Sequence, residues 1–310
     1  MGIFLKRRLF ITFFLLALFA FAQKSSNDKN KIENFLLNTN KSIAQWFDEV
    51  AESIDLYITG QQLKKEKNPS KLILENRTSS NEGQEIKNEI ALNGILRLPN
   101  LEEYWQLKFS SYDETTERQI KDTAYLKKTS RKENYGATVG LFRKLGDVSL
   151  AFQPRIELKS PLKISHSLTL KSEAKLNRLT INPKLDFYAT ADKGTGIFSS
   201  LDFNYELTQK YRLNWINNSD YVSQTHIISF SNGLILNEAV DNKRSLSYGI
   251  MFFSNNKPLY YLNEFTIYSS YTQIIYKNIF RFELTPHLDF EKLQAFRGRA
   301  GLSLGLILEF

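Results

Sequence analysis

The chain contains three histidines, and one of them stands beside an acid in an arrangement that could serve catalysis. His287 lies two residues before Asp289, and residues two apart in an extended strand point to the same side. A carboxylate placed there could orient the imidazole as a general base. The same spacing is expected on any strand with one polar face, and His166 and His226 lack such an acid. His287 is therefore the only candidate for a hydrolase, and we expect no enzyme activity.

The other residue types exclude most cofactors. The 310 residues include no Cys, which rules out disulfides, thiolate metal sites and a lipid anchor on an N-terminal Cys. No phosphate-binding loop, nucleophile elbow or metal-ligand cluster occurs at its usual spacing, and the glycines of 191–196 are typical of a hairpin turn. We expect no cofactor and no metal ion.

Strands must position the charged residues, because apolar and polar residues alternate with a period of two from Lys71 to Phe310. Ile156 and Leu158, for example, alternate with Glu157 and Lys159. Many of these segments approach the roughly 9 to 11 residues of a tilted membrane strand. The predicted strands are 71–77, 86–98, 103–112, 134–144, 147–159, 164–176, 178–190, 195–207, 210–221, 224–236, 243–254, 259–274, 277–290 and 298–310. The first and fourth are weak, so we expect twelve to fourteen strands.

Two architectures suit this alternation. A soluble sandwich would bury its apolar faces against one another, whereas a membrane barrel would turn them towards lipid. Aromatic residues make up 13% of the chain, and many lie at strand ends, as in the aromatic girdles of membrane barrels. Strand length and aromatic placement favour an all-β, antiparallel, up-and-down transmembrane β-barrel of about 12–14 strands at residues 67–310, preceded by an N-terminal amphipathic helix.

Residues 1–22 have the features of a cleaved signal peptide. Lys6, Arg7 and Arg8 precede an apolar run, and Ala20 and Ala22 provide a small-x-small cleavage site. The run is shorter than the roughly 20 residues that a membrane-spanning helix needs. We expect a mature chain that begins at Gln23 and is exported through the inner membrane.

The segment 23–66 is predicted to be a helix, over 30–63, followed by a charged linker. Apolar residues, Trp46 and Phe47 among them, recur there at spacings of three and four. The amphipathic pattern requires an apolar partner without naming it. The helix could plug the lumen, pack under the barrel in the periplasm, or mediate oligomerisation through Trp46 and Phe47.

The last strand, GRAGLSLGLILEF, carries Leu304, Leu306, Leu308 and Phe310 on one face. Together with the signal peptide and the long alternation, this strand resembles the closing strand of Gram-negative outer-membrane β-barrel proteins. The resemblance implies that these four residues form the signal read by the barrel-assembly machinery, and that Gly301 and Gly305 stand where the signal tolerates glycine. It also implies the outer membrane of a Gram-negative bacterium as the location and the lipid bilayer as a partner.

In the predicted register the lumen face carries both signs of charge. The lumen-facing candidates are Arg155, Lys184, Asp186, Arg212, Arg281, Glu283 and His287. This mixture favours charge pairs between neighbouring strands and a narrow or partly filled lumen over a strongly anion-selective pore. The formal net charge of +8 falls to about +5 without Lys6, Arg7 and Arg8 of the signal peptide, since 38 basic residues then face 33 acidic ones. This remaining positive charge favours anionic partners, such as lipopolysaccharide phosphates or an anionic solute. The basic residues do not form a clustered stripe, so we expect no binding of nucleic acid.

These features predict a porin-like channel for small polar solutes, with a lumen of mixed charge. The alternative is a non-conducting structural or interaction barrel that binds a partner through the charged segment 113–133 or the N-terminal helix. A hydrolase centred on His287 is the third hypothesis. The sequence leaves the solute and the oligomeric state open.

Overall fold

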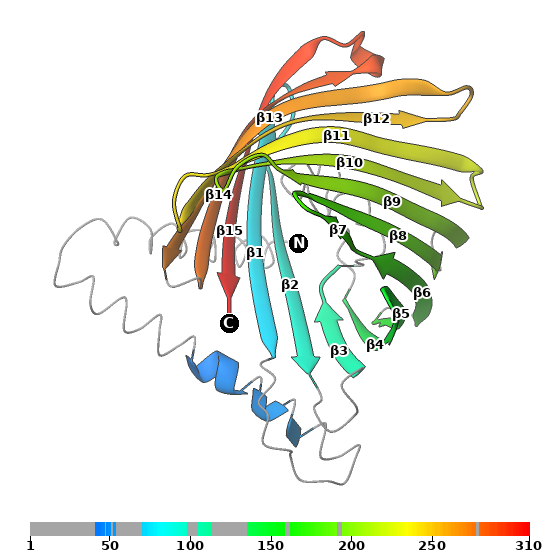
Figure 1. Cartoon of the computed structure of the whole chain (residues 1–310), viewed down its shortest axis with the longest axis vertical. Helices are drawn as coiled ribbons and strands as arrows, with labels where there is room; N and C mark the ends of the chain where they lie inside the picture. The colour runs from blue at the N-terminus through cyan, green and yellow to red at the C-terminus, as the bar shows by residue number, and fades with distance from the viewer. Residues whose placement is uncertain are drawn as a thin grey trace, which may run out of the picture.

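A computed structural model describes residues 41–46, 48–50, 52–53, 70–97, 105–112, 135–158, 162–190, 194–276 and 279–310. The described part is dominated by one curved antiparallel sheet that closes on itself (Figure 1). Its strands are β1 (Lys71–Asn81), β2 (Lys87–Arg97), β3 (Trp105–Ser110), β4 (Gly136–Leu145), β5 (Val148–Glu157), β6 (Lys163–Ser172), β7 (Ala174–Leu176), β8 (Leu179–Thr190), β9 (Gly194–Glu206), β10 (Tyr211–Val222), β11 (Ile227–Ala239), β12 (Arg244–Asn255), β13 (Tyr261–Tyr276), β14 (Phe280–Glu291) and β15 (Gly298–Glu309). A short 3-10 helix, η2 (Lys292–Gln294), precedes β15.

The sheet is a closed barrel of fourteen strands. β6 and β7 both pair with β8 and form one strand that is interrupted at Glu173. The fifteen strand elements therefore make a fourteen-stranded barrel. The prediction of a closed, all-antiparallel barrel of twelve to fourteen strands is confirmed. Both weakly predicted strands exist, and the first extends to Asn81, four residues beyond its expected end.

The first and last strands close the barrel. β1 pairs with β15 from Ile73 opposite Glu309 to Asn81 opposite Gly301. Leu72 and Phe310 extend this ladder, because each backbone N–H donates to the carbonyl oxygen of the other, at 3.1 and 2.8 Å. Closure leaves no open sheet edge, which is the condition for a sheet to cross a bilayer.

The two faces of the wall differ in chemistry because cross-strand partners share a face. One face carries exposed apolar side chains, including Leu92, Phe152 and Trp215. The other face carries buried polar ones, including Arg77, Asp186 and Ser303. Arg77 of β1 contacts Glu283 of β14 although β15 lies between them. Side chains converge in this way only on the concave side of a curved wall, so the polar face is the inner one.

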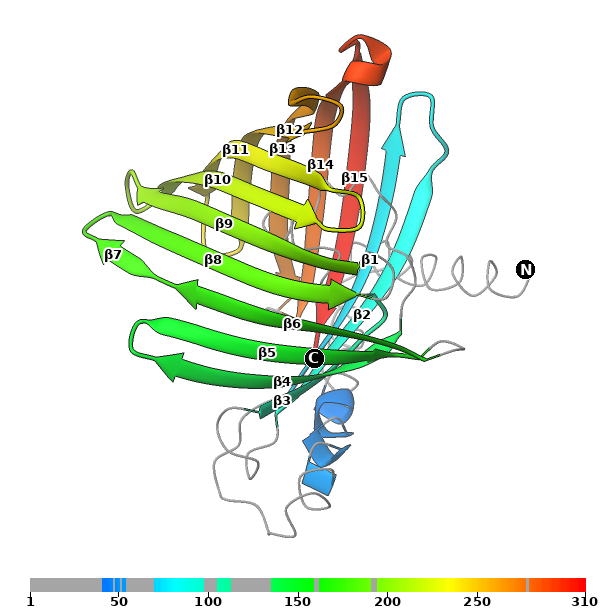
Figure 2. The ribbon, with the colours of Figure 1, turned by 90° about the vertical axis from the view of Figure 1, so that its right-hand side faces the viewer.

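The two ends of the barrel are also distinct. The described helical residues lie at the end where β1 begins and β15 ends, and the hairpins β1–β2 and β14–β15 lie at the opposite end (Figure 2). We call these the helix end and the hairpin end. The expected long loop 113–133 and the expected turn 99–102 lie outside the described residues.

Candidate functional site

The inner face of the barrel is the candidate functional site, since it carries most of the charged side chains of the described strands. The ladder places every lumen-facing candidate on this face, but it spreads them around the wall instead of gathering them into one centre. Arg155 lies on β5 opposite Ser165, Arg212 lies on β10 opposite Glu206, and Arg281 lies on β14 opposite Ile307. The inner face therefore consists of several regions that differ in charge and polarity.

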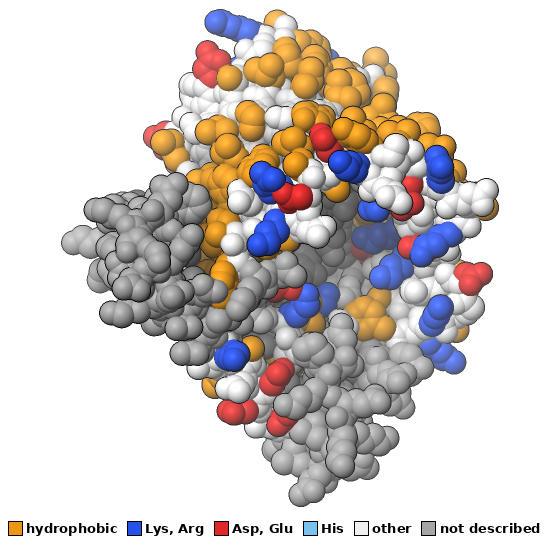
Figure 3. Space-filling view, turned by 60° about the vertical axis from the view of Figure 1, so that its left-hand side comes forward, with side chains coloured by type: hydrophobic (Ala, Val, Ile, Leu, Met, Phe, Trp, Pro, Cys, Tyr) orange, Lys and Arg blue, Asp and Glu red, His pale blue; other side chains and the backbone are white. Residues whose placement is uncertain are grey.

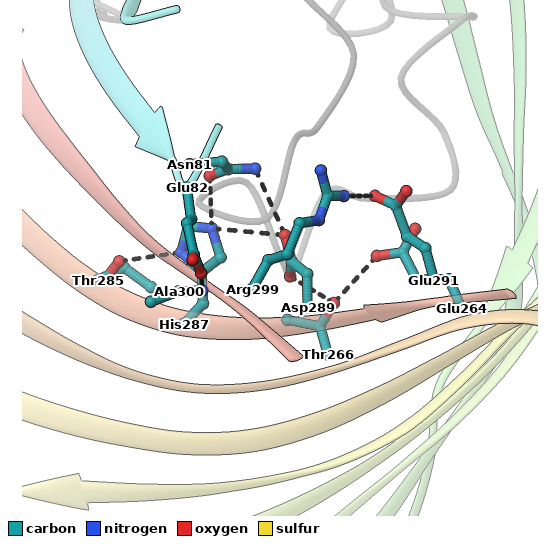
Figure 4. Close-up of polar contacts among 10 residues, drawn as sticks. All are labelled: Asn81, Glu82, Glu264, Thr266, Thr285, His287, Asp289, Glu291, Arg299 and Ala300. Atoms are coloured by element: carbon teal, nitrogen blue, oxygen red, sulfur yellow. Dashed lines mark hydrogen bonds and ion pairs between the residues drawn. The ribbon is translucent and has the colours of Figure 1, made fainter. Parts of the chain in front are cut away.

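One region is a polar cluster near the hairpin end, where Asn81 of β1 meets His287 and Asp289 of β14 (Figure 4). Nε2 of His287 lies 3.0 Å from Oδ1 of Asn81 and 3.7 Å from Oδ2 of Asp289. Asp289 is only 1% exposed, and the hydroxyl of Thr266 on β13 donates to its Oδ1 at 3.0 Å. A buried carboxylate is stable only when such donors surround it, so this cluster is a coherent network.

The geometry leaves His287 without an open general-base nitrogen. Nε2 faces the amide oxygen of Asn81, and Nδ1 faces the backbone carbonyl oxygen of Thr285 at 3.3 Å. A general base must present a nitrogen lone pair to the proton that it removes. Both nitrogens instead face oxygens of the protein, so the contacts fit a network that ties strands together.

This network belongs to a closing seam, which we define as the inner face of β14, β15 and β1. Asn81 reaches His287 directly above Gly301 of β15, where an added Cβ would lie under 3.0 Å from both side chains. Lower in the seam, Arg77 of β1 contacts Glu75 at 2.8 Å and reaches Glu283 of β14 at 3.4 Å. Lys71 and Glu309 pair at the helix end. Polar contacts therefore join β1 to the last two strands along the height of the barrel.

The same arrangement recurs on the far side of the barrel. The hydroxyl of Tyr188 on β8 donates to Oδ1 of Asp220 on β10 at 2.7 Å. The ring passes over Gly196 of β9, where an added Cβ would lie under 3.0 Å from it. An inner glycine thus lets its two neighbouring strands bond to each other above it.

A second region, the basic wall, is the inner face of β5, β6 and β8. Its cations are Arg155, Lys163, Lys171 and Lys184, and they outnumber the acids Glu157 and Asp186. Lys171 lies directly opposite Lys184, an unfavourable placement for two like charges. Lys184 Nζ lies 5.0 Å from the ring centroid of Phe198, which gives that charge a cation–π partner. Asp186 accepts from Thr169 Oγ1 at 3.0 Å.

A third region of the inner face is apolar. Ile216, Ile235, Met251 and Tyr268 form a buried cluster on neighbouring strands β10 to β13. By their ladder positions they share the inner face with Arg212 and Glu264. The alternation in the sequence does not predict this cluster, because these residues place apolar side chains on the polar face. The sequence does contain one indication of this cluster, which is the presence of glycines that lie opposite its large side chains, such as Gly249 opposite Tyr268.

The predicted assembly residues lie on the outer face of β15. Leu304 lies opposite Thr78, Leu306 opposite Asn76, and Leu308 opposite Leu74. Phe310 follows in the same alternation. Their predicted role as an assembly signal concerns recognition by another machine and stays a prediction.

The two residues proposed for helix packing are described unequally. Residues 41–46, 48–50 and 52–53 are helical, and Trp46 is 59% exposed. The side chain of Phe47 lies outside the described residues, as do most residues of the predicted helix 30–63. Val50 packs against the buried side chain of Leu96 on β2.

The other two histidines lie apart from these clusters. His166 lies on the outer face of β6, opposite Pro154. His226 lies in the turn after β10, where its Nδ1 is 3.3 Å from the hydroxyl of Tyr221. Over the described ranges, no group of three or more metal-ligating side chains is present. No helix in the described part is long and apolar enough to cross a membrane.

Comparison with known proteins reveals a likeness of fold. No protein-family model and no curated protein matches the chain. A loop L8 deletion mutant of OmpT, an outer membrane protein of Vibrio cholerae, aligns with a TM-score of 0.49 and 7% identity, over 78% of this chain and 98% of that chain. OmpF of Salmonella typhi gives 0.49 and 6%, over 78% and 97%. The outer membrane channel DcaP of Acinetobacter baumannii gives 0.45 and 6%, over 78% and 96%.

The chain is similar to these outer-membrane proteins, and its closed antiparallel barrel is shown by its own strand pairing. Identities of 6 to 7% and TM-scores below 0.5 are too low for any role of those proteins to be carried to this chain. The functional proposal therefore rests on the chemistry of this chain's own inner and outer faces.

Proposed function

We propose that this protein is an outer-membrane β-barrel channel for small polar solutes. The observation that carries the proposal is the separation of side-chain chemistry across a closed wall, with exposed apolar residues outside and polar ones inside. Figure 3 shows hydrophobic side chains gathered over one part of the surface and charged side chains of both signs over another. An apolar outer face suits lipid, because the closed sheet already satisfies its backbone hydrogen bonds.

The lengths of the strands support a membrane position. Most strands have 10 to 16 residues, with β4 at the lower and β13 at the upper limit. A tilted strand needs about 9 to 11 residues to cross the hydrocarbon layer. Export by a signal peptide at 1–22 and assembly through Leu304, Leu306, Leu308 and Phe310 belong to the same proposal, with lipopolysaccharide as the surrounding outer-leaflet lipid.

The basic wall supports a preference for anionic solutes. Lys171 and Lys184 face each other across β6 and β8, and an anion beside them would relieve their repulsion. Across the barrel, the seam holds Glu283, Asp289 and Glu291 together with their own donors and cations. The lumen therefore has mixed charge overall, while the cations of one wall are the better placed to attract a solute.

One observation favours the alternative, a non-conducting interaction barrel. The inner cluster of Ile216, Ile235, Met251 and Tyr268 is apolar, whereas a water-filled passage is usually lined by polar groups. A barrel closed at that level would serve as a rigid support for a partner.

Planar bilayer recording distinguishes the two functions. We expect steady single-channel steps from the purified mature chain, and a reversal potential that favours anions in a salt gradient. Silence from a chain that is folded, as judged by heat-modifiable migration on gels, would overturn the channel and favour the interaction barrel.

A further inference from the structure

The described helical residues, which are 41–46, 48–50 and 52–53, contact the barrel on its outer face. Val50 packs against Leu96, which is 1% exposed, together with Leu72 and Leu107. Leu96 pairs with Leu107, and Leu72 pairs with Gly94 two residues before Leu96, so these residues share one face of the wall. Leu74 and Leu92 continue that face, and Leu92 is exposed on the outside. The helix contact is therefore the lower edge of the outer apolar belt.

A second contact fixes the helix at this edge. The backbone N–H of Ser70, just before β1, donates to Oδ1 of Asp48 at 3.2 Å. Asp48 and Val50 thus attach the helix to the start of β1 and the end of β2. Figure 2 shows the helical residues beyond the helix end of the wall, below the C-terminus. This position differs from the lumen, where a plug would contact Arg77 or Glu283.

The exposed part of the helix has the chemistry of a membrane interface. Trp46 lies four residues before Val50, so the two side chains project from the same side of the helix. Val50 meets the apolar belt, and Trp46 continues that side with 59% of its surface exposed. Tryptophan is enriched where hydrocarbon meets headgroups, and an amphipathic helix with such a residue lies in that plane.

We propose that these helical residues form an anchor on the lipid side of the barrel, with Trp46 in the headgroup region of the nearer leaflet. This inference rests on the proposed membrane location. The exposed side of the helix lies against phospholipid, because the surface that the helix contacts is continuous with the outer apolar belt, which the proposed function assigns to lipid. A soluble partner, a second copy of the chain and a lumen plug are the competing occupants.

Tryptophan fluorescence in the full mature chain tests the anchor, because the sequence has three tryptophans. One variant carries Trp105→Phe and Trp215→Phe and reports on Trp46 alone. The matched control carries Trp46→Phe and Trp105→Phe and reports on Trp215, which lies on the outer face of β10 and is exposed. Both are reconstituted in phosphatidylcholine vesicles with bromine at a shallow or a deep acyl position.

We expect both tryptophans to be quenched, with Trp46 quenched more by the shallow bromine. Val50→Asp should lower the quenching of Trp46 several-fold and leave that of Trp215 unchanged, because it removes the contact with Leu96. If Trp215 is quenched while Trp46 responds only to aqueous acrylamide, the anchor is overturned and the membrane barrel stands. If neither is quenched by lipid, the membrane location itself is overturned.

Deletion of residues 23–66 separates the anchor from the plug. An anchor outside the wall predicts the same single-channel conductance with and without the segment. A rise in conductance on deletion would place the helix in the passage and contradict the inference.

Discussion

The closing seam and the basic wall belong to the same sheet, yet they use charge differently. In the seam, Arg77 contacts Glu75 and Glu283, and Asp289 is surrounded by donors. On the basic wall, Lys171 and Lys184 face each other as like charges. Joining the first strand to the last is the pairing of greatest sequence separation in the barrel, and its loop-closure entropy must be offset by contacts. The comparison indicates that the seam's charges stabilise closure, and it supports the proposal that those of the basic wall act on solutes.

The largest expected effect comes from removing the seam's central cation. Arg77→Met would leave the carboxylates of Glu75 and Glu283 together in a largely buried place, at a cost of about 3 kcal/mol in the free energy of unfolding. Denaturant unfolding in detergent micelles, followed by intrinsic fluorescence, measures the loss. Arg281→Met is the matched control, because Arg281 contacts the same Glu283 at 3.6 Å from a half-exposed position, with 43% of its side chain accessible against 6% for Arg77. The control should lose at most about 1 kcal/mol. Equal losses would show that position in the seam is irrelevant.

A smaller effect is expected at the glycine beneath the Asn81–His287 contact. Gly301→Ala would force both side chains away from each other and leave Asp289 with fewer partners, which should cost about 2 kcal/mol. Gly305→Ala is the control on the same strand, because its Cβ would approach Glu283 only to 3.4 Å. The fraction of heat-modifiable, folded barrel after refolding reports the difference. A Gly305 variant that is equally impaired would remove the special role of Gly301.

The basic wall should respond in selectivity while its stability changes little. Lys171→Glu would place an acid opposite Lys184, relieve the repulsion between them and remove positive charge from the passage. We expect the ratio of anion to cation permeability to fall several-fold, measured as a reversal potential in a salt gradient. Arg281→Glu on β14 is the comparison and should change this ratio less, since its charge already lies beside Glu283. The opposite ranking would mean that solutes pass along the seam.

The sequence predicted the wall better than it predicted the site. Alternation identifies strands and faces because the side-chain period of a strand is two, and this placed Arg155, Lys184 and Glu283 on the inner face. The alternation of residue types does not show which residues of different strands lie close together. It therefore does not predict that Asn81 contacts His287 above Gly301. The resemblance implies only that the closing strand tolerates Gly301, whereas the missing side chain of this glycine creates the space for that contact. The apolar cluster around Met251 was missed because it departs from the alternation.

The smallest expected effect lies outside both regions, in the turn between β11 and β12. The Arg244 guanidinium donates to Asp241, and the backbone N–H of Lys243 adds a second donor, so the pKa of the Asp241 carboxyl lies below its usual 3.8. The ionised form therefore stabilises the turn. That contribution is fully present above the usual pKa and is lost as the pH falls through the lowered, folded value.

Carboxyl NMR titration of the folded barrel measures this shift. Arg244→Gln should return the Asp241 pKa towards its usual value, because it weakens the guanidinium hydrogen bond, the largest cause of the shift. Since Asp241 and Arg244 are exposed, the barrel's resistance to denaturant should change little compared with Arg77→Met. An unchanged Asp241 pKa would assign the shift to the backbone donors at Lys243 and Arg244, both at 2.8 Å. Either way, a small response in the turn would sharpen the contrast, because the same guanidinium–carboxylate chemistry stabilises the barrel strongly only where the seam buries it.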